Sequence, residues 1–231
     1  MQRRRFTTTL ICSAGLSVAG ASTAARAAGL SEADASLGVR AALERGATAA
    51  VGLLGRTGGF LDNPKVRIPL PGFLSEVAKL AKFTGQQKRV DALVTAMNRA
   101  AEAAVPEART LLIQAVKSMS VDDARRVITG GDDSVTQFFA SKTRVPLAAR
   151  FLPIVTAATE KVDLADKYNA LAGKAAATGL VKKEDANLQQ YVTGKTLDGL
   201  YLMIGEEERK IRKDPIGTGS AILQKVFGSL K

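Results

Sequence analysis

Apolar residues recur every three or four positions along most of this chain, which is the spacing of one face of an α-helix. Leu43, Ala47, Ala50 and Leu54 show this spacing near the N-terminus. No long stretch alternates apolar and polar residues, as a half-buried strand would. The pattern predicts helices over about 31–54, 73–83, 87–104, 106–119, 121–129, 133–159, 162–177, 185–213 and 220–227. We therefore expect an all-α, multi-helix, bundle-like domain.

One segment, residues 55–72, breaks the helical pattern. It holds seven glycines and prolines within eighteen positions. Val66, Ile68 and Leu70 alternate with polar residues or proline, which is the period of an extended chain with one apolar side. Pro69 has no N–H to donate, so this segment cannot be a central strand. We expect an extended Gly/Pro-rich connector that lies across the helices and covers part of the core.

Some helix ends carry local signals. Ser120 followed by Asp123 is typical of a capped helix start. Pro106 either kinks a long helix or opens a new one, because proline is tolerated in the first turn. Pro146 and Pro153 are expected to interrupt the helical segment 133–159.

The first 27 residues have the organisation of a secretory signal peptide. Arg3, Arg4 and Arg5 precede a run of apolar and small residues up to about position 20, and Ala25–Ala27 forms a small-x-small cleavage site. Arg3-Arg4 also resembles the twin-arginine export pattern, although an ordinary secretion signal explains the same charges. We expect residues 28–231 to form a single domain in the periplasm.

Composition then excludes several kinds of chemistry in the exported chain. Cys12, the only cysteine, lies in the leader, and the sequence has no histidine or tryptophan. Disulfides, Cys/His zinc sites and His- or Cys-based nucleophilic triads are therefore excluded. We expect no cofactor, no metal and no transmembrane segment in the mature chain, and the sequence identifies no catalytic residue.

Charge does not point to a nucleic-acid partner. The net charge is +11, and it falls to +7 once four leader arginines are removed. The remaining positive charges are interleaved with acids, and few aromatic residues are available for base stacking. Contact of the last predicted helix, 220–227, with a membrane surface is the less favoured third option.

The segment 129–133, Thr-Gly-Gly-Asp-Asp, is the sharpest local feature. It could place Asp132 and Asp133 beside backbone N–H groups and so hold a hard cation or position a general base. Glycine that ends one helix and aspartate that caps the next explain the same residues, and we favour that interpretation.

Asn98, Arg99 and Glu102 form a second feature, because residues three or four apart share a helix face. Such a network could bind a polar ligand, or it could pin one helix to a neighbour, which we favour. In all, seven residues make up the candidate ligand-binding site: Arg67, Asn98, Arg99, Glu102, Asp132, Asp133 and Lys142.

Three consecutive acids, Glu206, Glu207 and Glu208, suggest a metal cluster at first sight. Adjacent helix residues point about 100° apart, so these carboxylates do not converge. Glu206 lies four residues before Lys210, and Glu208 lies four residues before Arg212, so both are favourable helix pairs. We expect a solvated face here, with Glu207 as the exception because it lies near the apolar side of the helix.

Several of these segments together resemble DUF4197, a family of exported bacterial proteins of unknown function. The resemblance is carried by residues 58–71, 97–102, 129–133, 142–143 and 191–208, in the same order. It covers nearly the whole chain after the leader, from about Leu30 to Leu230. It implies a bacterial origin and an exported, mainly helical domain. It carries no known activity, so it transfers no catalytic role.

The sequence therefore supports two functions. The first is a non-enzymatic cell-envelope domain that binds a small ligand or an envelope protein. The alternative is a carboxylate-dependent, hydrolase-like enzyme that uses Asp132, Asp133 and Glu102 as acid or base. The alternative requires two or more of these carboxylates in one concave pocket, at least one of them with a raised pKa.

Overall fold

The computed structural model of the chain describes residues 32–72, 74, 85–131, 133–177, 179 and 186–214. Within these residues the fold is all-α, as the apolar spacing predicts, and it contains no strand. The predicted leader, the helix predicted at 220–227, Asp132 and most of the helix predicted at 73–83 lie outside the described residues.

The helices match the predicted segments closely. They are α1 (Glu32–Leu54), α3 (Gln87–Ala104), the 3₁₀ turn η1 (Val105–Glu107), α4 (Ala108–Lys117), α5 (Val121–Thr129), α6 (Ser134–Thr159), α7 (Asp163–Ala177) and α8 (Leu188–Lys213). Pro106 lies in η1, so it opens a new turn between α3 and α4 and does not kink one long helix. Helix α8 begins three residues later than the predicted start at about 185.

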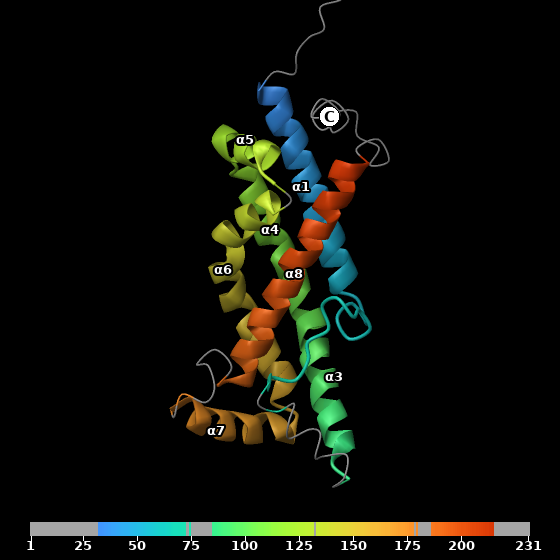
Figure 1. Cartoon of the computed structure of the whole chain (residues 1–231), viewed down its shortest axis with the longest axis vertical. Helices are drawn as coiled ribbons and strands as arrows, with labels where there is room; N and C mark the ends of the chain where they lie inside the picture. The colour runs from blue at the N-terminus through green and yellow to red at the C-terminus, as the bar shows by residue number, and fades with distance from the viewer. Residues whose placement is uncertain are drawn as a thin grey trace, which may run out of the picture.

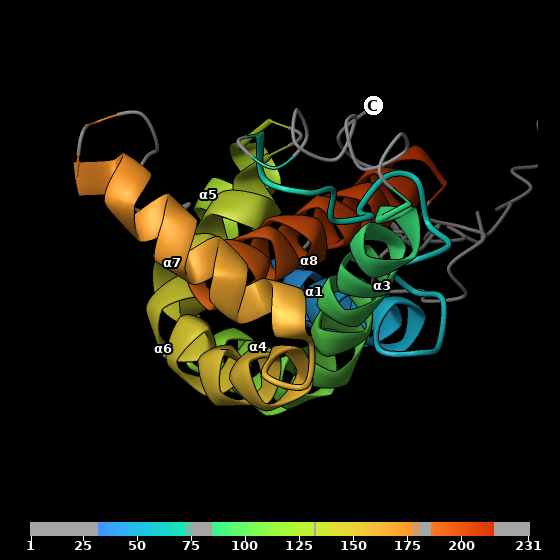
Figure 2. The same ribbon diagram turned by 90° about the horizontal axis from the view of Figure 1, so that it is seen from below.

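Helix α8 lies at the centre of the bundle, between α6 and α1 in Figure 1, and it packs mainly against these two helices. Helix α7 lies across the lower end, as Figures 1 and 2 both show. Val192 and Leu200 on α8 are fully buried, as are Phe139 and Phe151 on α6. The core therefore follows the length of α8.

Helix α6 runs without a break through Pro146 and Pro153, so the expected interruption is wrong. Both prolines are exposed, while Leu147 and Phe151 between them are fully buried. Each proline removes one N–H from the helix ladder, but on the exposed side water can satisfy the carbonyl that loses its partner. Packing of the opposite side holds the helix together.

The signals around α5 are met in part. Ser120 and Asp123 form a reciprocal capping box at its start. Gly130 ends the helix with an extended backbone (φ −75°), and a Cβ there would lie 2.6 Å from Arg126 O. Glycine is therefore needed for close packing and not for a left-handed turn. Asp133 occupies the N-cap position of α6, but its side chain makes no capping hydrogen bond, contrary to expectation.

The connector, residues 55–71, consists of turns and irregular chain that packs on the bundle. Val66 and Ile68 are buried, whereas Lys65 before them and Arg67 between them are exposed. Phe60 is fully buried against α8, where Gly199 lacks the Cβ that would lie 2.9 Å from the Phe60 ring.

No helix among the described residues is long and apolar enough to cross a membrane.

Candidate functional site

Asn98 on α3 holds the middle of the connector. Its side chain is fully buried, and its Oδ1 accepts a hydrogen bond from Ile68 N–H at 2.8 Å. Its Nδ2 donates to Ile68 O at 3.0 Å and to Val94 O, one turn back on α3, at 2.8 Å. The Asn98 amide thus satisfies both backbone groups of Ile68, as the backbone of a neighbouring β-strand would. The backbone of Ile68 is therefore hydrogen-bonded although it lies in no β-sheet.

Glu102, one turn further along α3, holds the start of the connector. Its Oε1 accepts hydrogen bonds from the backbone N–H groups of Phe60 and Leu61, at 3.1 and 3.0 Å. Its Oε2 accepts from Arg99 Nη1 at 2.6 Å. The Gly-rich stretch 55–59 leads directly into these two N–H groups. This loop therefore binds an anion through its backbone, but the anion is a carboxylate of the same chain.

The electrostatics of Glu102 fit this role. Burial alone would raise the pKa of its carboxyl, but hydrogen bonds from Leu61, Arg99, Phe60 and Gly58 outweigh burial and lower the pKa below its ordinary value. Glu102 is therefore ionised at neutral pH and has donors on both oxygens. It is poorly suited to act as a general acid or base.

The seven candidate residues do not form one cluster. Asn98, Arg99 and Glu102 lie together under the connector, with Arg67 exposed on its outer side. Asp133 and Lys142 are exposed on α6, and Lys142 adds to the charges that lower the pKa of Asp123, after the dominant hydrogen bonds from Ser120. Asp132 lies outside the described residues.

The two groups are well separated along α8. Gly199 contacts Phe60 near the Glu102 group, whereas Glu208 meets Ser134, next to Asp133. Glu208 lies nine positions after Gly199 on this helix, a rise of about 14 Å. Asp133 and Glu102 therefore do not share a pocket.

The C-terminal part of α8 contains an ion pair at a position where a solvated face is predicted. Glu208 is only 6% exposed, so the prediction of a solvated face is wrong at this position. Its Oε1 accepts from Arg212 Nε at 2.8 Å, and Arg212 Nη2 lies 2.7 Å from the same oxygen. Arg212 also donates to Val127 O, at the end of α5, at 2.6 Å. The predicted pairing of Glu208 with Arg212 is confirmed. The predicted pairing of Glu206 with Lys210 is wrong, because Glu206 pairs with Lys65 of the connector and Lys210 pairs with Glu207.

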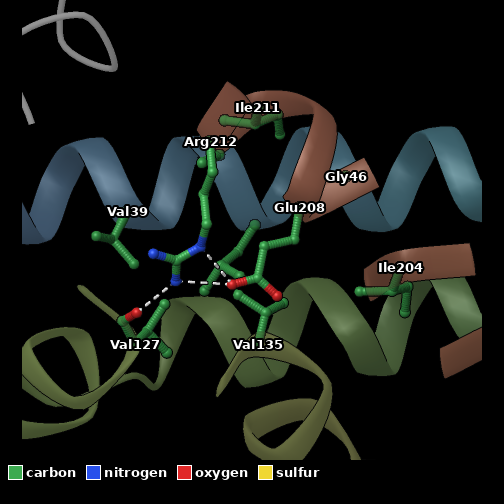
Figure 3. Close-up of a pocket in the computed structure, with 10 residues that line it drawn as sticks. Val39, Gly46, Val127, Val135, Ile204, Glu208, Ile211 and Arg212 are labelled. Atoms are coloured by element: carbon green, nitrogen blue, oxygen red, sulfur yellow. Dashed lines mark hydrogen bonds and ion pairs between the residues drawn. The ribbon is translucent and has the colours of Figure 1, made fainter. Parts of the chain in front are cut away.

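The second carboxylate oxygen of Glu208 has no hydrogen-bond partner among the described residues, although it is buried. Figure 3 shows one oxygen taking both contacts from Arg212 while the other points away from that side chain. The backbone N–H of Val135 is close enough to favour the ionised carboxylate of Glu208, although no described donor meets hydrogen-bond geometry at Oε2. A buried acceptor without a donor is costly, by about 1–3 kcal/mol, so this oxygen needs explanation.

Glu208 lines a narrow, mainly apolar pocket between four helices. Its other lining residues are Val39, Ala42, Leu43 and Gly46 from α1, Val127 from α5, Val135 from α6, and Ile204, Ile211 and Arg212 from α8 (Figure 3). The pocket has a cavity volume of about 20 Å³. That volume holds about one water molecule, and the rest of the lined space is open to solvent.

This environment shifts the titration of Glu208. Burial raises the pKa of its carboxyl above the ordinary value, and the opposing contacts with Arg212, Ser134 and Val135 do not cancel the effect of burial. A buried carboxyl with a raised pKa in a concave apolar pocket makes Glu208 a candidate functional residue.

A larger, open hollow adjoins the pocket, with a volume of about 500 Å³. Asp123, Arg126, Asp133, Ser134 and Gln137 are among the residues that line it. Most of these side chains are polar, and Ser134 contacts both Glu208 and Arg212. Asp133 therefore faces a depression of ligand size, next to the pocket but apart from the connector.

Sequence reasoning missed Glu208, although a signal was present. Leu197, Tyr201, Ile204 and Ile211 mark the buried side of α8, and position 208 continues their spacing of three and four. Glu207, expected near the apolar side, is half-buried and pairs with Lys210 at 2.6 Å. The buried acid is therefore its neighbour.

The profile of one protein family, described as "Protein of unknown function (DUF4197)", matches residues 29–228. The chain belongs to this family. No curated protein and no solved structure matches this DUF4197 chain.

Within this DUF4197 domain the family-like segments divide into two structural roles. Residues 58–71 and 97–102 supply the connector and the side chains that bind it. Residues 129–131, 133 and 206–208 lie at the end of the bundle that contains the pocket. No group of three or more acidic, histidine or cysteine side chains in the described ranges is arranged to hold a metal ion. The chemistry available at the pocket is thus one carboxylate, one guanidinium and an apolar wall.

Proposed function

We propose that this chain is an exported, non-enzymatic binding domain of the cell envelope, and that its ligand occupies the Glu208 pocket. The observation that carries the proposal is the Glu208 Oε2 atom, which is buried, has no hydrogen-bond donor among the described residues and belongs to a side chain that lines a cavity. Most buried polar atoms have a hydrogen-bond partner, so a ligand that donates to this oxygen would complete the site.

The pocket walls indicate the chemical class of the ligand. Val39, Leu43, Ile204 and Ile211 present aliphatic surface, and Glu208 supplies the only acceptor without a partner among the described lining atoms. An ammonium group small enough for the closed volume, on a slender aliphatic chain that lies along the open part of the lining, satisfies both. Its charge would also favour the ionised form of Glu208, whose pKa burial has raised.

Binding accounts for the geometry better than catalysis does. Glu102 is ionised and bound on both oxygens, and Asp133 lies on another part of the bundle. A hydrolase-like mechanism needs two carboxylates close together, with their pKa values apart. Of the three proposed acids the structure describes Glu102 and Asp133, and this pair does not meet the requirement.

Export is supported by the leader-like sequence of residues 1–27 alone. N-terminal sequencing of the native protein from a periplasmic fraction tests it, and the expected first residue is Ala28. Replacement of Arg3 and Arg4 by lysine should block export only if the twin-arginine route is used. An intact Met1 in the cytosolic fraction would contradict the proposal.

Ligand binding is tested with hexylammonium and hexanoate, which have equal chain length and opposite charge. Hexylammonium should raise the melting temperature of the purified chain, because a ligand that binds only the folded state stabilises it. Hexanoate should not. Glu208→Gln should remove the preference for the cation, and Gly46→Leu should abolish binding by filling the pocket.

Gly52→Leu provides the matched control for Gly46→Leu. Gly52 is exposed on the same helix, and a Cβ there meets nothing within 4 Å. The Gly52→Leu variant should show the same rise in melting temperature with hexylammonium as the wild type. Equal stabilisation of the wild type by both compounds, or by neither, would overturn the assignment of the site.

A further inference from the structure

The outer side of α6 presents an apolar strip to solvent. Val145 is 81% exposed and Leu152 is 37% exposed. Exposed residues continue the strip at three- and four-residue spacing, which places them on one side of the helix. The α6 strip consists of Val145, Pro146, Ala149, Leu152, Pro153 and Ala157. Figures 1 and 2 show α6 at the edge of the bundle, so no described helix covers this side.

The charges around the α6 strip are positive. Helix α6 contains no aspartate or glutamate over its 26 residues. Lys142 and Arg150 are exposed at the start and on the flank of the strip. The nearby Asp198 on α8 is paired with Arg144 at 2.6 Å, and Glu160, just beyond the helix, is followed by Lys161.

We infer that the α6 strip docks on an anionic phospholipid surface. A helix whose outer side carries apolar residues flanked by lysine and arginine fits the boundary between headgroups and acyl chains. Each basic residue adds attraction to anionic headgroups. A second copy of this chain fits less well, because two identical strips would bring Lys142 and Arg150 towards the same cations of the other copy, with no acid on either helix.

The two prolines limit the depth of docking. Pro146 and Pro153 cannot donate to the carbonyls of Lys142 and Ala149, four residues earlier. Such carbonyls are costly in the hydrocarbon layer but find donors among water and headgroups. The strip therefore lies at the headgroup level, parallel to the membrane. This inference uses no residue of the Glu208 pocket, so it stands or falls independently of the proposed function.

Vesicle co-sedimentation of the full chain tests the inference. The wild type should bind vesicles of equal phosphatidylglycerol and phosphatidylcholine, and not vesicles of phosphatidylcholine alone. Binding should weaken at 0.5 M NaCl, because salt screens surface charge. Lys142→Gln with Arg150→Gln should weaken binding by roughly 30-fold, the effect of two lost basic contacts. Val145→Glu with Leu152→Glu should weaken it at least as much.

Leu37→Glu with Leu202→Glu is the matched control, because these leucines are 55% and 41% exposed on α1 and α8. This pair should leave binding unchanged, and circular dichroism should show that every variant is folded. Equal binding of all variants, or no binding of the wild type, would overturn the inference. Loss of a dimer in the Val145/Leu152 variant without any vesicle binding would also overturn it and assign the strip to a second copy.

Discussion

The side chain of Asn98 bonds both backbone groups of Ile68, accepting from the N–H at 2.8 Å and donating to the carbonyl at 3.0 Å. The two residues are 30 positions apart in the sequence. Two other side chains, both from α8, add to this attachment: Tyr191 Oη donates to Pro69 O, and Lys65 pairs with Glu206. The connector is thus held by side chains of two helices.

Asn98→Ala should destabilise the fold by about 2–4 kcal/mol, because two buried backbone groups of Ile68 lose their partners. Urea denaturation measures the change. Arg67→Ala, at an exposed position next to Ile68, is the control and should stay within about 0.5 kcal/mol of the wild type. Similar stability of both variants would show that Asn98 does not hold the connector.

Glu102→Gln should destabilise the fold by about 1–3 kcal/mol at pH 7, because charged hydrogen bonds to Phe60, Leu61 and Arg99 are weakened. The folded pKa of Glu102 lies below its unfolded value of 4.5. Its contribution is therefore complete above about pH 4.5 and is lost as the pH falls through the folded pKa. The difference between variant and wild type should shrink from pH 7 towards pH 3 in urea titrations. A constant difference would contradict this account.

Glu208→Gln should show the opposite trend. The folded pKa of Glu208 lies above its unfolded value of 4.5, so the folded state holds the proton more tightly. The resulting stability is complete below about pH 4.5 and is lost as the pH rises through the folded pKa. Glutamine does not titrate, so the stability of the variant relative to the wild type should increase between pH 4.5 and pH 7.5. Denaturation at these two pH values measures the gain, and a loss would exclude a raised pKa.

Gly59→Ala should destabilise the fold by about 1–3 kcal/mol, as overpacking does. A Cβ at this position would lie 2.7 Å from Leu53 O and also contact Leu54 O, and backbone cannot move aside easily. Gly52→Ala is the control on α1, where the added methyl group meets open space and should stabilise by up to about 1 kcal/mol. Thermal denaturation of the two variants should therefore shift in opposite directions.

Local signals predicted much of the fold. The Ser120–Asp123 capping box involves groups only three residues apart, so the sequence contains both partners. Pro146 and Pro153 failed as signals because their effect depends on which side of α6 faces solvent. That side is set by packing against other helices, and the proline itself does not reveal it.

The candidate site was predicted less well. Asn98, Arg99 and Glu102 were found by their spacing, but their backbone partners lie in the connector, 30 to 42 positions away. Glu208 was assigned to the surface because its neighbours in sequence are charged. Its burial depends on α1, α5 and α6 closing around it, which a pattern within α8 indicates only through the spacing from Ile204 and Ile211.

The hydrogen bond from Phe60 N–H to Glu102 joins residues 42 positions apart, so it forms only after the chain has been synthesised as far as Glu102. A nascent polypeptide that ends before Glu102 has no acceptor for the amides of Phe60 and Leu61, so the Gly-rich turn is not attached to α3. Contacts of such long range slow folding, because the intervening chain must first be brought into place. Prematurely terminated translation products should therefore expose the Phe60 ring to proteases that the complete protein resists.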